Sequence, residues 1–237
     1  KLILEQINKS NISKTNIKIF NTLSVVSDEE TPLTAIKNSK NSSMWNSINS
    51  QITDGSDISL SAGNTGVLFV ISRMLLKTIE GVSKPALAGL WPNKKGVSVV
   101  LDLGANIECN EKNLIDFAEM GSALFKSLFK NQKPKVALLN IGSEEIKGTE
   151  AIKKAHNKLK EVSSFGDFDF NGYVEADKIF EGNSNVIIAD GFTGNIALKT
   201  AEGTSKFLTS ELKDSLTENI FSRLSLVFSY FSLKKFK

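Results

Sequence analysis

Cysteine and proline are scarce in this chain of 237 residues, which has one cysteine and four prolines. The single cysteine, Cys109, rules out an intrachain disulfide and any cysteine-rich metal site, so we predict no metal. Its lone thiol is typical of a reducing compartment, and we therefore expect a cytoplasmic protein. The hydrophobic content of 41% is that of an ordinary globular chain.

Long apolar runs and an excess of one charge are also missing. No segment approaches the roughly 20 apolar residues that span a bilayer, and the first residues lack the apolar stretch of a signal peptide. The 29 basic and 26 acidic residues nearly balance, so nothing in the total charge indicates nucleic acid as a partner.

A strand, a glycine-containing turn and a helix recur along the sequence. Apolar runs predict strands at 97–101, 136–140 and 186–189, each followed by a helical pattern, and a shorter run at 58–60 precedes a helix over 65–78. Upstream, the pattern predicts a helix over 1–10, a strand at 16–20 and two short helices within 31–53. Repeated strand–helix units with continuously apolar strands indicate an α/β fold, a mostly parallel sheet with helices on both faces.

Four turns are expected to meet at the carboxyl edge of this sheet, where open α/β sheets bind ligands. Glycines and helix N-termini in these turns favour an anion such as phosphate. The predicted substrate-binding or phosphate-binding residues are Ser61, Gly63, Asn64, Thr65, Gly66, Asp102, Gly104, Asn106, Asn140, Gly142, Gly191, Thr193 and Gly194. The alternative for Asn64, Thr65 and Asp102 is that each only caps a helix or turn.

Four residues are predicted to be catalytic: Lys147, Asn195 and Asp190 in these turns, and Lys199 one turn into the helix that follows the last of them. A lysine there would neutralise phosphate charge, and Asn195 would donate to an oxyanion, although a lysine is as readily a solvated surface residue. His156 is expected to be a surface or boundary residue, and Cys109 is expected to be a small core or loop residue rather than a nucleophile. No cofactor motif is present, since both the dinucleotide fingerprint and the P-loop spacing are missing.

Several long motifs together resemble the PlsX phosphate acyltransferases. They are SAGNTG from Ser61, LDLGAN from Leu101, EMGSALFKSLF from Glu119, LLNIGSEEIKG from Leu138 and DGFTGNIALKTAEG from Asp190. The resemblance implies a Rossmann-like α/β/α sandwich akin to isocitrate dehydrogenase and phosphotransacetylase, and a homodimer. It also implies attack of inorganic phosphate on the thioester of acyl carrier protein, giving acyl phosphate for a membrane glycerol-3-phosphate acyltransferase in phospholipid synthesis.

Two family features are not found in this sequence. The family typically begins with a strand and a DAMGGD loop and ends with a loop containing HGSS, and both motifs are missing here. We therefore expect the chain to be part of a longer product and to be inactive by itself. We predict an α/β acyltransferase domain over 1–206, incomplete at its N-terminus, and an amphipathic membrane or dimer segment over 207–237.

The C-terminal segment carries a broad apolar and aromatic stripe followed by lysines, typical of a helix on an anionic membrane surface or in a dimer. Phe221, Leu224, Val227, Phe228 and Phe231 are the predicted membrane contacts, on the inner face of the cell membrane. Two other functions remain open at this point: a short-chain phosphotransacetylase that uses coenzyme A, and a catalytically silent membrane scaffold.

Overall fold

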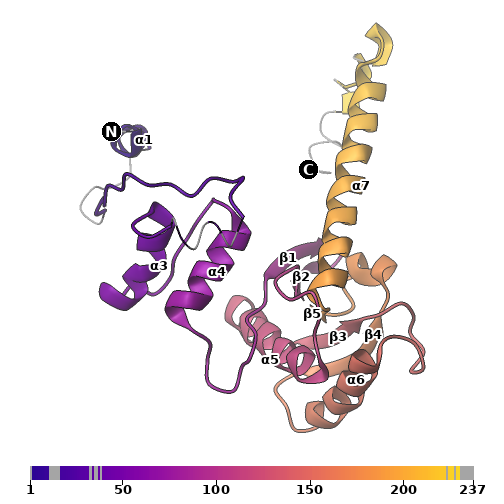
Figure 1. Cartoon of the computed structure of the whole chain (residues 1–237). Helices are drawn as coiled ribbons and strands as arrows, with labels where there is room; N and C mark the ends of the chain where they lie inside the picture. The colour runs from indigo at the N-terminus through magenta and orange to yellow at the C-terminus, as the bar shows by residue number, and fades with distance from the viewer. Residues whose placement is uncertain are drawn as a thin grey trace. The chain divides into compact units, whose positions relative to one another are not determined.

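The computed structural model describes residues 2–10, 17–31, 34, 37, 39–222, 224–226 and 228–229. The chain divides into two units, Lys1–Ile79 and Glu80–Lys237, shown in Figure 1. The predicted boundary between 206 and 207 is a different one and falls inside a continuous helix. The functional division at that position therefore stays a prediction.

The first unit is helical. It contains α1 (Leu2–Lys9), α3 (Ser43–Thr53) and α4 (Thr65–Leu76). Side chains from α3 and α4 form a small core with Val26. The helices predicted over 1–10 and 65–78 are confirmed, as is the second of the two short helices within 31–53, whereas most of the first lies outside the described residues.

Two predicted strands of this unit are wrong. Residues 17–20 and 58–60 have no regular structure, and Asn16 lies outside the described residues. Ile58 and Leu60 are 72% and 83% exposed. An alternating pattern becomes a strand only where another strand supplies the ladder hydrogen bonds, and neither segment pairs within the described residues.

The second unit is built on a five-stranded sheet with the order β1-β2-β5-β3-β4. Its strands are β1 (Ala88–Asn93), β2 (Gly96–Leu101), β3 (Lys135–Leu139), β4 (Asp169–Val174) and β5 (Val186–Ile188). β1 pairs antiparallel with β2, and the other three pairings are parallel. The predicted α/β class with a mostly parallel sheet is confirmed, while the two edge strands β1 and β4 were not predicted.

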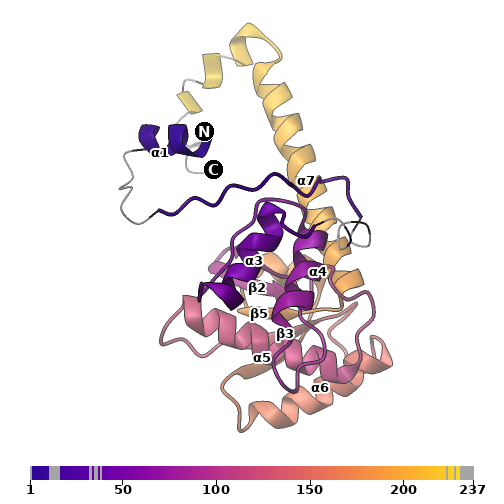
Figure 2. The ribbon, with the colours of Figure 1, turned by 60° about the vertical axis from the view of Figure 1, so that its left-hand side comes forward.

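Helices cover both faces of the sheet. On one face lie α5 (Glu111–Leu128) and α6 (Glu150–Ser163), which pack against each other and are seen together in Figure 2. The other face carries the 3-10 helix η2 (Ala176–Glu181) and α7 (Gly191–Thr217). Alternate strand residues separate the two cores, since Val99 and Leu101 face α5 whereas Val100 faces α7.

Each of these three α-helices begins at a capping side chain after a strand. Asn110 and Asn113 form a reciprocal capping box at α5, Thr149 caps α6 and Asp190 caps α7. Such caps satisfy backbone N–H groups that the first helical turn leaves unpaired. The strand-end sequences therefore determine where the helices start, and they place three capped helix N-termini after β2, β3 and β5.

Candidate active site

Three of the four predicted turns leave the sheet at the same edge. β2, β5 and β3 are neighbours and run parallel, so the turns 102–106, 190–195 and 140–148 follow their carboxyl ends side by side. This confirms the expected arrangement for those three turns. The fourth turn, Ser61–Gly66, belongs to the first unit, and its meeting with the others stays a prediction.

Asp102 organises the turn after β2. Its side chain is fully buried, and its two carboxylate oxygens accept hydrogen bonds of 2.7 to 3.3 Å. The donors are the backbone amides of Leu87, Gly104, Ala105 and Asn106 and the side-chain amide of Asn106. Both oxygens are thus committed to the turn itself, which corresponds to the structural alternative raised for Asp102.

Asn106 is committed in the same way. It is 8% exposed, and its Nδ2 also donates to the carbonyl of Pro85 at 2.7 Å. Its carbonyl oxygen accepts from the amide of Gly191 at 2.8 Å, which ties the first turn to the second. Gly104, at φ +126°, lies against Asn195. Asn195 is exposed beside this junction, a position open to a substrate oxygen.

The turn after β5 joins α7 through close packing. A Cβ added to Gly194 would collide with the carbonyl oxygen of Asp102, and one added to Gly191 would lie 2.6 Å from that of Asn106. Asp190 accepts from the amide and the hydroxyl of Thr193 at 2.8 and 2.9 Å. The positive end of α7 is therefore already neutralised by a carboxylate of the chain itself, which weakens it as a phosphate site.

The turn after β3 is closed by Asn140, which is 7% exposed. Its Nδ2 donates to the carbonyl of Lys147 at 3.1 Å, and its Oδ1 is buried with no hydrogen-bond partner in the described structure. Gly148 has φ +98° and passes so close to Asn140 that a Cβ would lie 2.5 Å from Oδ1. An unpaired buried acceptor is energetically costly.

The two predicted catalytic lysines are both in ion pairs. Lys147 Nζ lies 2.8 Å from Glu144 and folds across Gly142, and Lys199 Nζ lies 2.9 Å from Glu202. The hydrogen bond and charge of Glu144 raise the pKa of Lys147, and the same contact lowers the pKa of Glu144. Lys147 is therefore held as a cation at neutral pH, and an incoming phosphate would have to compete with a carboxylate for either lysine.

In the first unit, Asn64 performs the capping role raised as its alternative. Its Oδ1 accepts from the amide of Val67 at 3.1 Å at the start of α4. Its Nδ2 donates to the carbonyls of Asp28 and Glu30 at 3.0 and 3.1 Å, which holds the segment before α3. Ser61 accepts from the amide of Gly63, while Thr65 and Gly66 form the first turn of α4. Phosphate binding by this loop stays a prediction.

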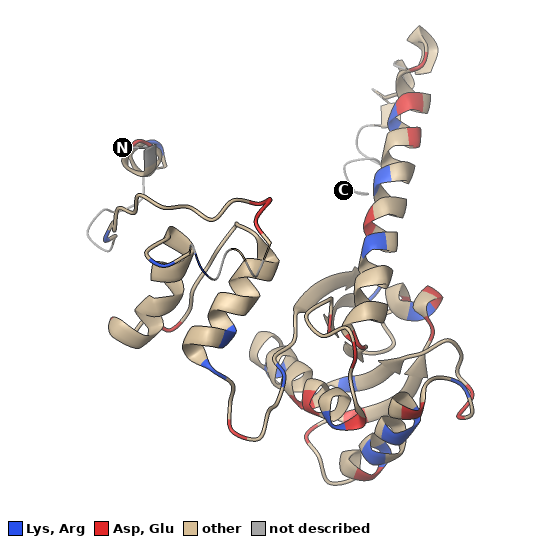
Figure 3. Cartoon of the chain, viewed as in Figure 1, with Lys and Arg blue, Asp and Glu red and all other residues tan. Residues whose placement is uncertain are grey.

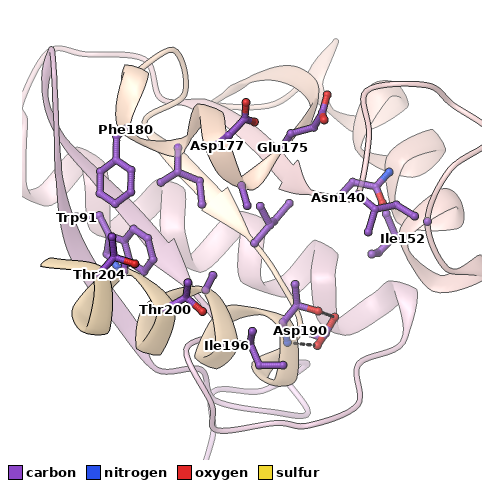
Figure 4. Close-up of a pocket in the computed structure, with 18 of the residues that line it drawn as sticks. Trp91, Asn140, Ile152, Glu175, Asp177, Phe180, Asp190, Ile196, Thr200 and Thr204 are labelled. Atoms are coloured by element: carbon purple, nitrogen blue, oxygen red, sulfur yellow. Dashed lines mark hydrogen bonds between the residues drawn. The ribbon is translucent and has the colours of Figure 1, made fainter. Parts of the chain in front are cut away.

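A cavity of about 840 Å³ opens on the α7 face of the sheet. Three of the predicted residues, Asn140, Asp190 and Thr193, line it, as Figure 4 shows for the labelled Asn140 and Asp190. The other predicted residues of the second unit do not: Asp102, Gly104, Asn106, Gly142, Lys147, Gly191, Gly194, Asn195 and Lys199. The predicted residues thus divide among this cavity, the junction of the turns 102–106 and 190–195, the turn 140–148 with Gly142 and Lys147, and Lys199 further along α7.

Much of the cavity wall was not foreseen from the sequence. Trp91 comes from β1, and Glu175, Asp177 and Phe180 come from the segment after β4. Both edge strands contain glycine or proline, which are uncommon inside strands. No local pattern therefore pointed to these residues, because their position depends on pairing with strands far away in the chain.

The lone cysteine and histidine do not form a catalytic pair. Burial raises the pKa of the Cys109 thiol, which is neutral as expected of a packing residue. His156 was expected to be a surface or boundary residue, and this is wrong: it is 7% exposed and packs against the rings of Phe170 and Tyr173. The described residues contain no group of three or more His, Cys, Asp or Glu side chains suited to a metal ion.

None of the helices in the described part of the chain is both long and apolar enough to cross a bilayer. In the predicted membrane-contact set, Phe221, Leu224 and Phe228 are 79%, 55% and 88% exposed. Val227 and Phe231 lie outside the described residues. The exposed aromatic side chains fit an interface, and the kind of interface stays a prediction.

The whole sequence, residues 1–237, matches the family described as "Fatty acid synthesis protein". The chain belongs to this family. It is 56% identical over 222 residues to a protein of Pelagibacter ubique named phosphate acyltransferase, covering 94% of this chain and 66% of that protein. A phosphate acyltransferase of Caulobacter vibrioides is 41% identical over 209 residues, covering 88% of this chain and 58% of that protein. The resemblance to the PlsX family is thereby confirmed.

The fold also has a solved counterpart. The EutD phosphotransacetylase of Staphylococcus aureus superposes with a TM-score of 0.59 at 16% identity, covering 86% of this chain and 72% of that one. At this identity the likeness shows the fold alone, and it confirms the predicted phosphotransacetylase-like architecture. The chain spans only 66% and 58% of the lengths of the two relatives above.

Proposed function

We propose that the complete protein transfers the acyl group of an acyl carrier protein thioester to inorganic phosphate, as an acyl-[acyl carrier protein]:phosphate acyltransferase of phospholipid synthesis. The observation that carries the proposal is the match of all 237 residues to the family, together with 56% identity to a relative named phosphate acyltransferase. The second unit supports it, because three loops and their capped helices meet at the carboxyl edge of the sheet, where α/β folds hold substrates.

In the proposed reaction an oxygen of inorganic phosphate attacks the carbonyl carbon of the acyl thioester. The tetrahedral intermediate collapses, the carbon–sulfur bond breaks, and acyl phosphate and the carrier thiol are formed, with a proton passing to the thiolate. Phosphate is partly a dianion at neutral pH, so no strong base is required. Asn195 is the proposed donor to the oxyanion, and Lys147 and Lys199 are the proposed counter-charges for phosphate once they leave Glu144 and Glu202.

The acidic carrier protein is proposed to dock on basic residues of the first unit. Arg73 and Lys77 are exposed, lie four positions apart at the end of α4, and form no ion pair within the described residues. Most lysines of α6 and α7 lie among acidic residues, as the interspersed blue and red of Figure 3 illustrates. Unpaired cations are the better partners for an acidic surface, because no internal carboxylate competes.

A homodimer that touches the cytoplasmic face of the membrane through the end of α7 and the exposed Phe221, Leu224 and Phe228 completes the proposal. Acyl phosphate is reactive and partitions into lipid, so release at the membrane would serve the glycerol-3-phosphate acyltransferase that consumes it.

The test is phosphate-dependent loss of the acyl carrier protein thioester with the complete protein. We expect turnover with phosphate and none with sulfate, and weaker activity with the coenzyme A thioester. The double variant Arg73→Glu/Lys77→Glu should raise KM for the carrier-bound substrate about tenfold with little change in kcat. Lys18→Glu, a charge change elsewhere in the first unit, is the matched control. Absence of turnover above background would rule out the assignment and favour a scaffold.

A further inference from the structure

The cavity on the α7 face is apolar over most of its wall. Leu139 and Ile179 lie on one side, and the stacked rings of Trp91 and Phe180, with centroids 5.8 Å apart, close one end. Its volume of about 840 Å³ lies within the range of ligand pockets, roughly 300 to 1,000 Å³. All of its lining residues belong to the second unit.

Short side chains on α7 keep this space open. Thr193, Ala197, Ala201 and Thr204 line the cavity and follow one another at intervals of four, four and three residues, the spacing of one helical face. Eleven residues of helix rise about 16 Å. Carbon–carbon bonds of about 1.52 Å at about 111° advance roughly 1.25 Å per atom, so this length matches an extended chain of about 13 carbons.

The two ends of the cavity differ in chemistry. Figure 4 shows Trp91, Phe180 and Thr204 at one end and Asn140, Ile152 and Asp190 at the other. The second end lies where β3 and β5 finish, next to the three loops of the candidate site. It also holds Asn140, whose buried Oδ1 has no partner in the described structure. An elongated apolar cavity with one polar end suits a linear chain that carries a polar head.

We propose that this cavity binds the acyl chain of the thioester, with the carbonyl at the Asn140–Asp190 end and the terminal methyl at Trp91 and Phe180. The inference rests on the proposed function and adds to it the position and polarity of the bound chain. Glu175 and Asp177 also line the cavity, and their carboxylates repel the carboxylate of a bound fatty acid. The site therefore selects a neutral acyl group over a free fatty acid.

Fluorescence of Trp91 gives a direct test in the complete protein. Since this chain has two tryptophans, Trp45→Phe leaves Trp91 as its reporter, and any tryptophan elsewhere in the complete protein is replaced likewise. The probe is a long-chain fatty amide with bromine on its terminal carbon, because bromine quenches an indole that it touches. We expect saturable quenching, and much weaker quenching when bromine is next to the carbonyl. Equal quenching by both amides, or none, would overturn the proposed orientation.

Substitutions in α7 test the location. Ala201→Phe fills the part of the cavity toward Trp91 and Phe180. It should weaken the affinity for the long-chain amide on the order of 100-fold, while the affinity for an amide of four carbons changes less than about twofold. Ala201→Leu should cause a smaller loss of affinity for the long-chain amide, and it replaces Ala201→Phe in the test if that variant does not fold. Gly203→Phe is the matched control, since a Cβ there meets no atom within 4 Å, and it should leave binding unchanged. Equal effects of Phe at 201 and 203 would refute the location.

A further variant tests whether the carboxylates of Glu175 and Asp177 exclude a charged ligand. Glu175→Gln/Asp177→Asn should raise the affinity for the brominated free fatty acid about tenfold and leave the amide unchanged. No gain for the acid would refute the proposed selection of neutral chains.

Turnover separates this inference from the proposed function. If acyl thioester is consumed normally but no amide quenches Trp91 and Ala201→Phe has no effect, the cavity assignment fails and the enzyme assignment stands. If amides bind as expected without phosphate-dependent turnover, the acyl site stands and the enzyme assignment fails.

Discussion

The two halves of α7 have the same backbone and opposite surroundings. In the first half, Gly191 and Gly194 are buried against the turn 102–106, and Ala197, Leu198 and Ala201 pack on the sheet. In the second half, Phe207, Leu208 and Leu212 are 62%, 59% and 42% exposed. Figure 1 shows the helix continuing past the sheet. Along this helix, the residues packed against the turn and the sheet are mostly small, whereas the large apolar residues beyond the sheet are exposed.

Small residues occur where α7 contacts the chain's own backbone. Large apolar residues occur where no other described residue packs over the helix. An exposed row of large apolar side chains marks an interaction surface, which supports the proposed membrane or dimer contact. Four substitutions test this contrast, each in the complete protein.

Gly194→Ala should have the largest effect. The added methyl group would overlap the carbonyl oxygen of Asp102, so the start of α7 must move away from β2. We expect a loss of about 3 kcal/mol in the free energy of unfolding, measured by urea denaturation. A loss below about 0.5 kcal/mol would show that α7 is not held by this contact.

Asp190→Ala should come next. It removes the cap that accepts from the amide and hydroxyl of Thr193. The expected loss is about 1 to 2 kcal/mol by the same measurement. Asp190→Asn keeps an acceptor and is the control, and it should recover at least half of the loss. If asparagine were no better than alanine, the residue would not be acting as a cap.

Gly203→Ala should act in the opposite direction. Its Cβ would enter open space in the interior of a helix, so the substitution mainly reduces the freedom of the unfolded chain. We expect a gain of about 0.5 to 1 kcal/mol in the free energy of unfolding. Destabilisation instead would mean that a partner packs closely on this face in the complete protein.

Phe207→Gln with Leu208→Gln should change stability least. Both side chains are exposed in the described structure, and glutamine is a good helix former, so the expected change is within about 0.5 kcal/mol. Sedimentation with anionic phospholipid vesicles should nevertheless decrease by at least about threefold. Ser210→Gln, an exposed and uncharged change on the same half, is the control for sedimentation. A large loss of stability with unchanged sedimentation would indicate that protein, not lipid, covers these residues.

The sequence predicted the central strands and the helices that follow them, because these signals are local. Val97–Leu101 is apolar except for Ser98, Val186–Ile188 is apolar throughout, and Asn110, Thr149 and Asp190 are caps that act on residues three positions away. The strand predicted at residues 58–60 from the same kind of local signal is wrong, because no strand pairs with this segment in the described structure. These local signals also missed β1 and β4, whose glycine, proline and asparagine residues are poor strand formers.

For the candidate site, the sequence located the turns but not what each polar group does. The buried environment of Asp102 and the ion pairs of Lys147 and Lys199 depend on which oxygens and nitrogens come within hydrogen-bond distance. Such distances combine residues from several elements, so residue type and spacing alone cannot supply them. Binding by these residues stays a prediction for the experiments above.

The amino-acid sequence by itself determined the α/β class, the family and the residues that start each helix, because apolar runs, caps and long motifs are read from neighbouring positions. The tertiary structure decided that Trp91 and Phe180 meet Asn140 and Asp190 around one cavity. Those residues come from different strands and helices, and only the pairing order of the sheet and the packing of α7 against it bring them together.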